Sequence, residues 1–359
     1  MTARWGSIAL VVLVAGWMLY KLKRMDTGQK QRMGQAIACT DAKDGFPLKP
    51  QAEILGYGLE EPRGLAADAN GRVFVLENNW SLIRYGPEST PMARLDQRTP
   101  CPKESCVGAD QRGIAIAGDR LFIAEHGRGL VTIMPVPGAS AASARSPLAE
   151  TPKQMTGPSG IAAAGNAIFI TDDRPWPGPP GKESSYDSAD YGRWLDKGAA
   201  RTLGAIYTCN SDKCAPELIS GALRHPSGIA ARCEEGPVFV AEADGREVRW
   251  PIYSKNAGKW EQTGALASVP ISGASLASFL GVALDQSGRL VFAAGPGGLY
   301  VFKSDGELLG RMIFDEPVGG VAVQQGYVYL TVGHKLCRIP FRPLSALKTP
   351  PQQARAVLP

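Results

Sequence analysis

The sequence predicts an all-β protein built as a six-bladed β-propeller, and a repeated motif is the main reason. Glycine, an aliphatic residue and alanine follow one another six times, starting at Gly64, Gly113, Gly160, Gly228, Gly281 and Gly320. Nine to eleven residues after each glycine comes an aromatic residue in an apolar run: Phe74, Phe122, Phe169, Phe239, Phe292 and Tyr329. The glycines are 49, 47, 68, 53 and 39 residues apart, a period that suits sheets of four short strands.

Each repeat unit is expected to contain short strands joined by tight turns. Second strands are predicted where β-branched and aromatic residues cluster, as at 72–76, 121–124 and 237–241. The turns at 69–71 and 286–288 place Asn or Ser before Gly, which is typical of hairpins because these residues tolerate positive φ. Third strands are predicted at 81–85, 129–133, 247–250 and 298–302.

Composition and charge fit a single globular body. Hydrophobic residues make up 44% of the chain, and 42 Gly and 28 Pro supply the many turns that six sheets need. The net charge is only +5, and six of the basic residues lie in the first 32 positions. Because no basic stripe is interleaved with aromatic residues, nucleic-acid binding is not expected.

Residues 1–32 are predicted to form a membrane anchor. An uncharged run is followed by basic residues, and Trp5, Trp17 and Tyr20 are placed as interfacial anchors. The run is longer than a typical signal-peptide core and has no small-residue cleavage site directly after it. An uncleaved single transmembrane helix is therefore favoured over a cleaved signal peptide. The other predicted parts are a linker at 33–49, the propeller at 50–342 and a C-terminal tail at 343–359.

Six of the seven cysteines can be arranged as three disulfides. Two pairs are local, with four residues between the cysteines, and the third would join the two ends of the ring. The candidate pairs are Cys101 with Cys106, Cys209 with Cys214, and Cys39 with Cys337. Cys233 is left over. A metal site or free thiols are the alternatives for the two local pairs.

Two features of the sequence disagree about the side of the membrane on which the propeller lies. Disulfides persist outside the cytosol, which favours the extracytoplasmic (periplasmic) face. The basic residues after the apolar run outnumber those before it, which by the positive-inside rule would leave the propeller in the cytoplasm. The cysteines are given the greater weight, so the extracytoplasmic face is predicted.

The last two repeat units carry distinctive segments: FLGVALD at 279–285, GPGGLYVF at 295–302, DGELLG at 305–310 and YVYLTVG at 327–333. These residues resemble the senescence-marker-protein/gluconolactonase/lactonase-like family of six-bladed propellers. The N-terminal anchor, the first local cysteine pair and the segment at 121–125 are similar to strictosidine-synthase-like and adipocyte-plasma-membrane-associated proteins. The resemblance covers about residues 50–342, and it is more specific for the fold than for an activity.

The resemblance implies a divalent cation, usually calcium, held by oxygen ligands at the top of the central channel. The cation would polarise a lactone or ester carbonyl for attack by water. The family's ligand positions correspond to Glu60, Ser159, Ser227 and Leu280 in this chain. Only Glu60 keeps the family's ligand type. No metal or other cofactor is therefore expected, and Ca²⁺ belongs to the alternative in which the chain is a hydrolase.

An acidic residue recurs at the end of the second strand of four repeat units. The residues are Glu77, Glu125, Asp172 and Glu242, with Asp173 and Asp244 beside two of them. A ring of acids suggests a rebuilt ligand site. An acid at this position commonly caps the neighbouring turn, however, and capping is the favoured explanation.

The three histidines, His126, His225 and His334, all lie in predicted loops. A histidine in a loop is more often solvated or hydrogen-bonded than catalytic. His225 precedes a loop expected to face the channel, so it joins Glu60 as a candidate catalytic residue. No nucleophile elbow, P-loop or paired zinc motif is present in the sequence.

A long insertion at 173–201 accounts for the 68-residue step between the third and fourth glycines. Its aromatic residues are Trp176, Tyr186, Tyr191 and Trp194. A loop of this length on a rigid scaffold often carries recognition, as a lid over the channel or as a surface for a protein partner. An ordered surface insertion without such a role is the other explanation.

Three classes of function are consistent with these features. The missing ligands and the anchor favour a membrane-anchored, extracytoplasmic and non-catalytic accessory subunit that binds a membrane-protein partner. The alternative is a metal-dependent lactonase or arylesterase with an altered ligand set. A third class binds a small molecule in the channel without chemistry. Whether the chain is an enzyme is left open, with a non-enzyme favoured.

Overall fold

The computed structural model describes residues 48, 52–77, 81–86, 91–96, 111–126, 129–136, 146–147, 155, 157–173, 203–212, 214–271, 277 and 279–341. All of them belong to one compact unit, Asp41–Pro359. The predicted anchor, with Trp5, Trp17 and Tyr20, lies outside the described residues, as does the tail at 343–359. Within the described ranges, no helix is both long and apolar enough to cross a bilayer.

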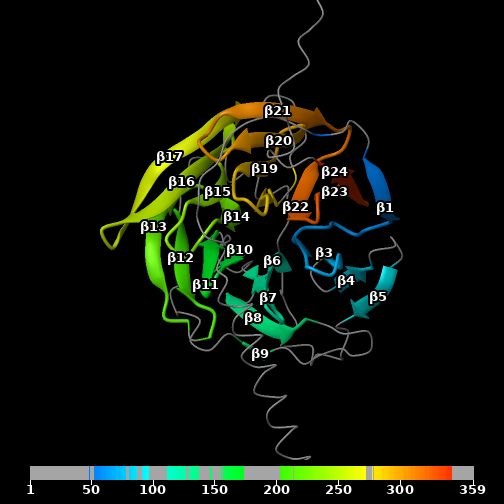
Figure 1. The fold of residues 1–359 in the computed structure, drawn as a ribbon, viewed down its shortest axis with the longest axis horizontal. Helices are drawn as coiled ribbons and strands as arrows, with labels where there is room; N and C mark the ends of the chain where they lie inside the picture. Colours follow the sequence, from blue (N-terminus) through cyan, green and yellow to red (C-terminus); the bar gives the residue numbers. More distant parts are fainter. Residues whose placement is uncertain are drawn as a thin grey trace, which may run out of the picture. The chain divides into compact units, whose positions relative to one another are not determined.

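The described part of the chain forms six four-stranded antiparallel sheets, which confirms the predicted six-bladed propeller (Figure 1). The first sheet holds β2 (Leu65–Ala67), β3 (Val73–Glu77), β4 (Ser81–Tyr85) and β5 (Pro91–Asp96). The second holds β6 (Gln111–Ala117), β7 (Arg120–Glu125), β8 (Leu130–Pro135) and β9 (Ser146–Pro147). The third holds β10 (Pro158–Ala164), β11 (Ala167–Asp172), β12 (Gly204–Asn210) and β13 (Glu217–Leu223).

The remaining three sheets follow the same order from the inner to the outer strand. The fourth holds β14 (Pro226–Ala231), β15 (Val238–Ala243), β16 (Glu247–Asn256) and β17 (Lys259–Pro270). The fifth holds β18 (Val282–Leu284), β19 (Leu290–Gly295), β20 (Gly298–Lys303) and β21 (Leu308–Ile313). The sixth holds β22 (Val318–Gln324), β23 (Tyr327–Val332), β24 (Lys335–Pro340) and, as its outer strand, β1 (Glu53–Tyr57).

The ring is closed by backbone pairing between the two ends of the described propeller. Each inner strand contacts the inner strand of the next sheet, and β22 contacts β2. The first strand, β1, pairs with β24 in the last sheet, with Ile54 opposite Cys337. The ladder hydrogen bonds between β1 and β24 therefore join segments from opposite ends of the chain.

The predicted disulfide between Cys39 and Cys337 is wrong, because Cys337 is a free thiol. Its side chain is buried in an apolar cluster formed by residues of the fourth to sixth sheets. Burial raises the pKa of this thiol to about 11. Cys39 itself lies outside the described residues. Strand pairing, and not a cross-link at Cys337, closes the ring.

The repeated alanine and the aromatic residue that follows it form the same cross-strand pair in every sheet. The pairs are Ala66–Phe74, Ala115–Phe122, Ala162–Phe169, Ala230–Phe239, Ala283–Phe292 and Ala322–Tyr329. The six aromatic side chains are between 0% and 4% exposed. The small alanine leaves room for the large ring between neighbouring sheets, so the repeat specifies the packing of the core.

The repeat glycines lie where the inner strands of neighbouring sheets approach most closely. At each of them, an added Cβ would lie closer than 3.0 Å to the carbonyl oxygen of the residue before the next unit's glycine. The glycine N–H donates to that same carbonyl at two junctions, from Gly228 to Leu280 (2.8 Å) and from Gly281 to Gly319 (2.9 Å). Only glycine permits this approach of two backbones.

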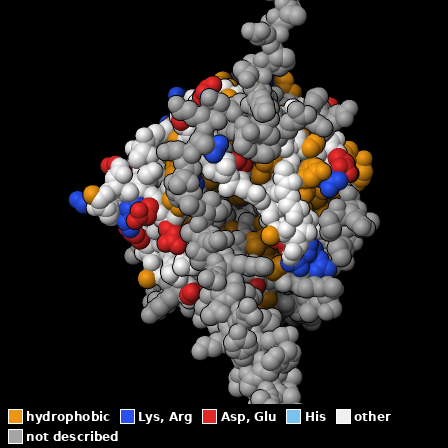
Figure 2. All heavy atoms as spheres, in the orientation of Figure 1, with side chains coloured by type: hydrophobic (Ala, Val, Ile, Leu, Met, Phe, Trp, Pro, Cys, Tyr) orange, Lys and Arg blue, Asp and Glu red, His pale blue; other side chains and the backbone are white. Residues whose placement is uncertain are grey.

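Charged side chains of both signs are interspersed with apolar ones over the described part of the face shown in Figure 2. Several large apolar side chains are exposed on outer strands, and Tyr57 of β1 and Ile313 of β21 are 71% and 70% exposed. Isolated exposed apolar residues are normal on soluble surfaces.

The predicted local disulfide between Cys209 and Cys214 is formed, with the two Cα atoms 4.7 Å apart. It closes the loop between β12 and β13, and both cysteines are buried. The other local pair, Cys101 with Cys106, lies outside the described residues. The disulfide therefore joins the end of β12 to the loop that leads into β13.

Removing this disulfide by Cys209→Ala and Cys214→Ala together is expected to lower the free energy of unfolding by about 2 kcal/mol. The reason is that the disulfide closes a short loop and so lowers the conformational entropy of the unfolded chain. Urea unfolding of the full-length protein measures the change, and the reduced wild-type protein serves as the matched control. An unchanged midpoint for both samples would show that the disulfide does not stabilise the third sheet.

Candidate functional site

The candidate site lies at one end of the sheets, which we call the site end. There the inner strands begin and the second strands finish, as the pairs Gln111–Glu125, Pro158–Asp172 and Pro226–Glu242 show. Residues just before the repeat glycines and residues just after the second strands therefore meet at the site end.

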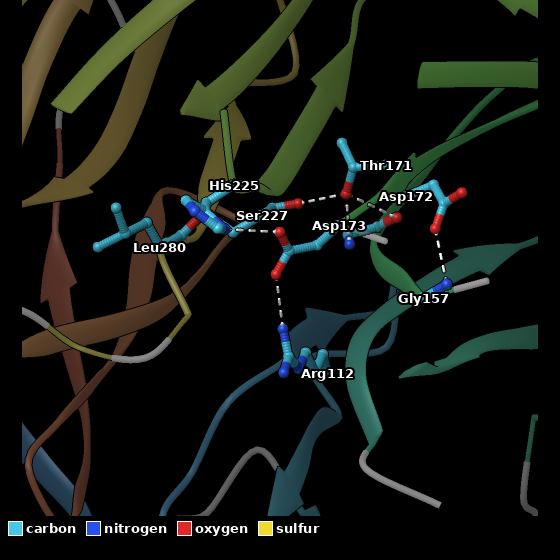
Figure 3. Close-up of polar contacts among 9 residues, drawn as sticks. Arg112, Gly157, Thr171, Asp172, Asp173, His225, Ser227 and Leu280 are labelled. Atoms are coloured by element: carbon cyan, nitrogen blue, oxygen red, sulfur yellow. Dashed lines mark hydrogen bonds and ion pairs between the residues drawn. The ribbon is translucent and has the colours of Figure 1, made fainter. Parts of the chain in front are cut away.

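Three side chains from three neighbouring sheets meet at the site end, with Arg112 and His225 on either side of Asp173 (Figure 3). Arg112 Nη1 lies 3.1 Å from Asp173 Oδ2, and His225 Nδ1 lies 3.1 Å from Asp173 Oδ1. Arg112 belongs to β6, Asp173 follows β11, and His225 precedes β14. The Arg112 and Asp173 side chains are each 10% exposed, whereas that of His225 is 20% exposed. Both carboxylate oxygens are thus engaged, and the imidazole retains access to solvent.

His225 adopts a left-handed backbone conformation, with φ of 47°. This conformation is uncommon for a residue other than glycine, and such residues are concentrated at functional sites. Glu242 Oε1 accepts a hydrogen bond from the N–H of Arg224 at 2.7 Å, which fixes the turn just before His225. The turn between β13 and β14 therefore points the imidazole at Asp173.

The end of β11 is held by its own side chains, which fixes the position of Asp173. Thr171 Oγ1 accepts a hydrogen bond from Gly160 N and donates one to Ser227 O, each at 2.6 Å. Asp172 Oδ1 accepts one from Gly157 N at 2.7 Å. All these groups are buried, so water does not compete for them. Thr171 thereby joins the third sheet to the fourth beside the site.

The recurring acids at the ends of the second strands are structural. Glu77, Asp172 and Glu242 each accept a hydrogen bond from a backbone N–H in the segment before the inner strand: those of Glu60, Gly157 and Arg224. Glu125 instead accepts one from Thr132 Oγ1 at 2.9 Å. Capping, the favoured explanation, is confirmed for the first three acids.

The four positions implied for a calcium site do not fit a hard cation. The Glu60 side chain is exposed, and Ser159 is buried, with an Oγ that has no partner among the described residues. Ser227 Oγ donates to Leu280 O at 3.4 Å, while Leu280 itself offers an aliphatic side chain. Hard cations prefer several carboxylate and carbonyl oxygens. The described residues contain no group of three or more His, Cys, Asp or Glu residues placed to hold a metal.

His126 is a second histidine near the site end, and it is 1% exposed. Burial lowers its pKa well below the ordinary value, and the cations of Arg112 and Arg63 lower it further. Asp173 opposes this shift in part. His126 is therefore neutral at physiological pH. His334, by contrast, makes a 2.7 Å contact from Nδ1 to Leu59 O near the closure of the ring.

The stability of the protein is expected to fall as the pH drops below about 6.5, the ordinary pKa of histidine. Because the folded-state pKa of His126 is lowered, the unfolded chain takes up this proton first. The free energy of unfolding then falls by up to about 1.4 kcal/mol per pH unit, until the folded-state pKa is reached. Urea unfolding at a series of pH values should show this slope, and His126→Gln should flatten it. If the free energy of unfolding fell equally steeply with pH in His126→Gln and in His334→Gln, the proton uptake would belong to another group.

The sequence patterns missed Arg112. Aligning the positions before the repeat glycines could have found it, since arginine occurs there at positions 63 and 112, serine at 159 and 227, leucine at 280 and glycine at 319. The predicted lid or partner residues Trp176, Tyr186, Tyr191 and Trp194 lie outside the described residues. Of the candidate catalytic residues, His225 lies in the cluster around Asp173 and Glu60 does not appear in it.

No family model and no curated protein matches the sequence. Solved structures do. The chain is similar to a gluconolactonase from Xanthomonas campestris, with a TM-score of 0.59, 19% identity, and coverage of 84% of this chain and 96% of the other. It is similar to a second, candidate gluconolactonase, with a TM-score of 0.60, 16% identity, and coverage of 81% and 92%.

A third similar structure is the PQQ-bound aldose sugar dehydrogenase from Streptomyces coelicolor. Its TM-score is 0.54 at 13% identity, with coverage of 82% of this chain and 100% of the other. At such identities the likeness concerns the fold. The chain is a six-bladed propeller whose fold matches that of gluconolactonase structures.

Proposed function

We propose that the protein hydrolyses a small lactone or ester at the site end, with His225 as the general base. The observation that carries the proposal is the 3.1 Å contact between His225 Nδ1 and Asp173 Oδ1. With Nδ1–H donated to the carboxylate, Nε2 carries the lone pair that can accept a proton. A base oriented by a third group is the arrangement that general-base catalysis requires.

In this mechanism, Nε2 of His225 removes a proton from a water molecule as the water oxygen attacks the carbonyl carbon. The tetrahedral intermediate then collapses, and the C–O bond to the leaving alkoxide breaks. The imidazolium returns its proton to that alkoxide, so a lactone yields a hydroxy acid and the histidine is regenerated. Asp173 and Arg112 act as positioning residues, because the carboxylate holds the ring and the guanidinium holds the carboxylate.

The substrate class rests on the fold likeness, since one of the similar structures is a gluconolactonase and another is a candidate gluconolactonase. The proposal departs from the metal-dependent version of that activity because the four implied ligand positions offer a poor ligand set. A membrane-anchored accessory role, extracytoplasmic location and a membrane-protein partner stay predictions, since the anchor lies outside the described residues.

The test is hydrolysis by the full-length protein after treatment with a chelator. A six-membered sugar lactone and an aryl ester serve as substrates, and acid release or absorbance measures the rate. Activity that survives chelation is expected. Activity lost on chelation and restored by calcium would contradict the His225 mechanism. Absence of turnover, with a membrane protein co-purifying in mild detergent, would instead favour the accessory role.

A further inference from the structure

At two junctions of the ring, the repeat glycine links its sheet to the next one through the backbone. The N–H of Gly228, in the fourth sheet, donates to the carbonyl of Leu280, just before the fifth sheet, at 2.8 Å. The N–H of Gly281 donates in the same way to the carbonyl of Gly319 in the sixth sheet at 2.9 Å. Neither link uses a side chain.

At the junction between the third and fourth sheets, the repeat glycine is linked through a hydroxyl group. Thr171 Oγ1 accepts a hydrogen bond from Gly160 N and donates one to Ser227 O, each at 2.6 Å. Thr171 is fully buried, so water does not compete for either bond. A hydroxyl that donates and accepts at the same time fixes its two partners relative to one another. Figure 3 shows this link together with the contact between Asp173 and His225.

The hydroxyl of Thr171 joins the two chain segments that carry the proposed base and its carboxylate partner. Asp173 follows Thr171 by two residues, just beyond β11, and Ser227 follows His225 by two residues at the start of β14. Because Asp173 and His225 belong to different sheets, their 3.1 Å contact depends on the relative position of these sheets. A catalytic group has to be held within about 0.5 Å of its productive position.

We propose that Thr171 is a positioning residue, which keeps the proton of the His225 imidazole on Nδ1 by fixing the third sheet against the fourth. Its importance for catalysis rests on the proposed function of His225 as the general base. Thr171 acts on the imidazole through Ser227 O on one side and through the strand end that leads to Asp173 on the other. Without this link, the carboxylate and the ring would move apart, and the neutral imidazole would populate both tautomers.

Thr331 provides a matched control in the sixth sheet. It is 1% exposed, and its Oγ1 accepts a hydrogen bond from Gly320 N at 2.7 Å, as that of Thr171 does from Gly160 N. Each threonine lies 11 residues after its repeat glycine. The sixth sheet, however, lies outside the three sheets that form the cluster around Asp173. Valine at either position removes a buried hydroxyl of the same kind.

The test is nitrogen NMR of the full-length protein with isotopically labelled histidine, at about pH 8.5, well above the ordinary pKa of histidine. The chain has three histidines, and His225→Asn identifies the signals of His225. The wild type is expected to show the Nδ1–H tautomer, and Thr171→Val a mixture of both tautomers. Thr171→Ser keeps the hydroxyl and should retain the wild-type pattern, as should Thr331→Val. In a lactone assay, Thr171→Val should lower kcat by up to about 10²-fold, with KM little changed.

The tautomer is measured without turnover, so a failure of Thr171 to position the base can be told from a failure of the proposed function. The wild-type tautomer in Thr171→Val, or the same mixture in Thr331→Val, would overturn the role of Thr171 whether or not a lactone is hydrolysed. If the mixture appeared only in Thr171→Val and no lactone were hydrolysed, the role of Thr171 would be supported and the general-base function of His225 contradicted.

A second variant decides the matter if Thr171→Val does not fold. Thr171→Cys keeps a side chain of similar size, and its thiol is a weak donor. An intermediate mixture of tautomers is then expected for His225. The pure Nδ1–H tautomer in Thr171→Cys would show that the hydroxyl is not what holds the contact between Asp173 and His225.

Discussion

His225→Asn is expected to lower kcat/KM for lactone hydrolysis by about 10²- to 10⁴-fold, the contribution typical of a positioned general base. Asparagine tolerates the left-handed backbone of this position, where φ is 47°, so the turn before β14 should persist. The variant removes the imidazole Nε2 that accepts the proton from water. Initial rates at several substrate concentrations measure the effect, and the melting temperature of the variant reports on its fold.

Asp173→Asn extends this test to the positioning of the base. The variant no longer presents two acceptor oxygens to Arg112 and His225, so the imidazole loses the partner that fixes its proton on Nδ1. A large loss in kcat and an altered pH–rate profile are expected. His334→Asn is the matched control and should retain activity, because His334 contacts Leu59 O and lies outside the cluster. Equal rates in all three variants would refute the proposed mechanism.

Gly228→Ala is expected to lower the free energy of unfolding by about 3 kcal/mol or more. A Cβ at this position would overlap the carbonyl oxygen of Leu280, and the backbone N–H of Gly228 donates to that same oxygen at 2.8 Å. The collision is with backbone, so no side-chain rotation relieves it. The inner strands of the fourth and fifth sheets would have to separate. Urea unfolding of the full-length protein measures the loss.

Gly264→Ala provides the matched control on β17 of the same sheet. The nearest atom to its added Cβ would be Ile252 Cδ1 at 3.8 Å, an ordinary contact. A near-neutral or slightly stabilising effect is expected there, since alanine restricts the unfolded chain more than glycine does. If both variants unfolded at the same urea concentration, the close backbone approach at Gly228 would not be the reason for glycine at this position of the repeat.

The repeat was sufficient to predict the number of sheets and the position of most inner and second strands. The glycine marks a backbone contact and the aromatic residue marks a core position, so both appear as local patterns along the chain. The addition of β1 to the last sheet was not predictable in this way. Arg338 and Glu53, which form an ion pair across β24 and β1, are 285 residues apart in sequence. Many short segments have the local sequence features of an outer strand, so the sequence pattern does not show which of them pairs with β24.

The candidate site was predictable only in part. The sequence identified His225 as a candidate base and noted Asp173 beside the recurring acids, but it did not place the two together. Their contact joins residues 52 positions apart, and Arg112 reaches Asp173 across 61 positions. The Cys337 thiol shows the same limit, since spacing allowed a disulfide there and the structure has it as a free thiol in the core.

The amino-acid pattern alone was enough for the six-sheet ring, because each sheet repeats the same local requirements for a glycine and an aromatic residue. Which polar side chains meet at the site end depended on how neighbouring sheets pack, since the contacts of β6 with β10 and of β10 with β14 bring residues of three consecutive sheets within hydrogen-bonding distance. Such contacts obey no local period, and for that reason Arg112, Asp173 and His225 became one cluster only in the folded protein.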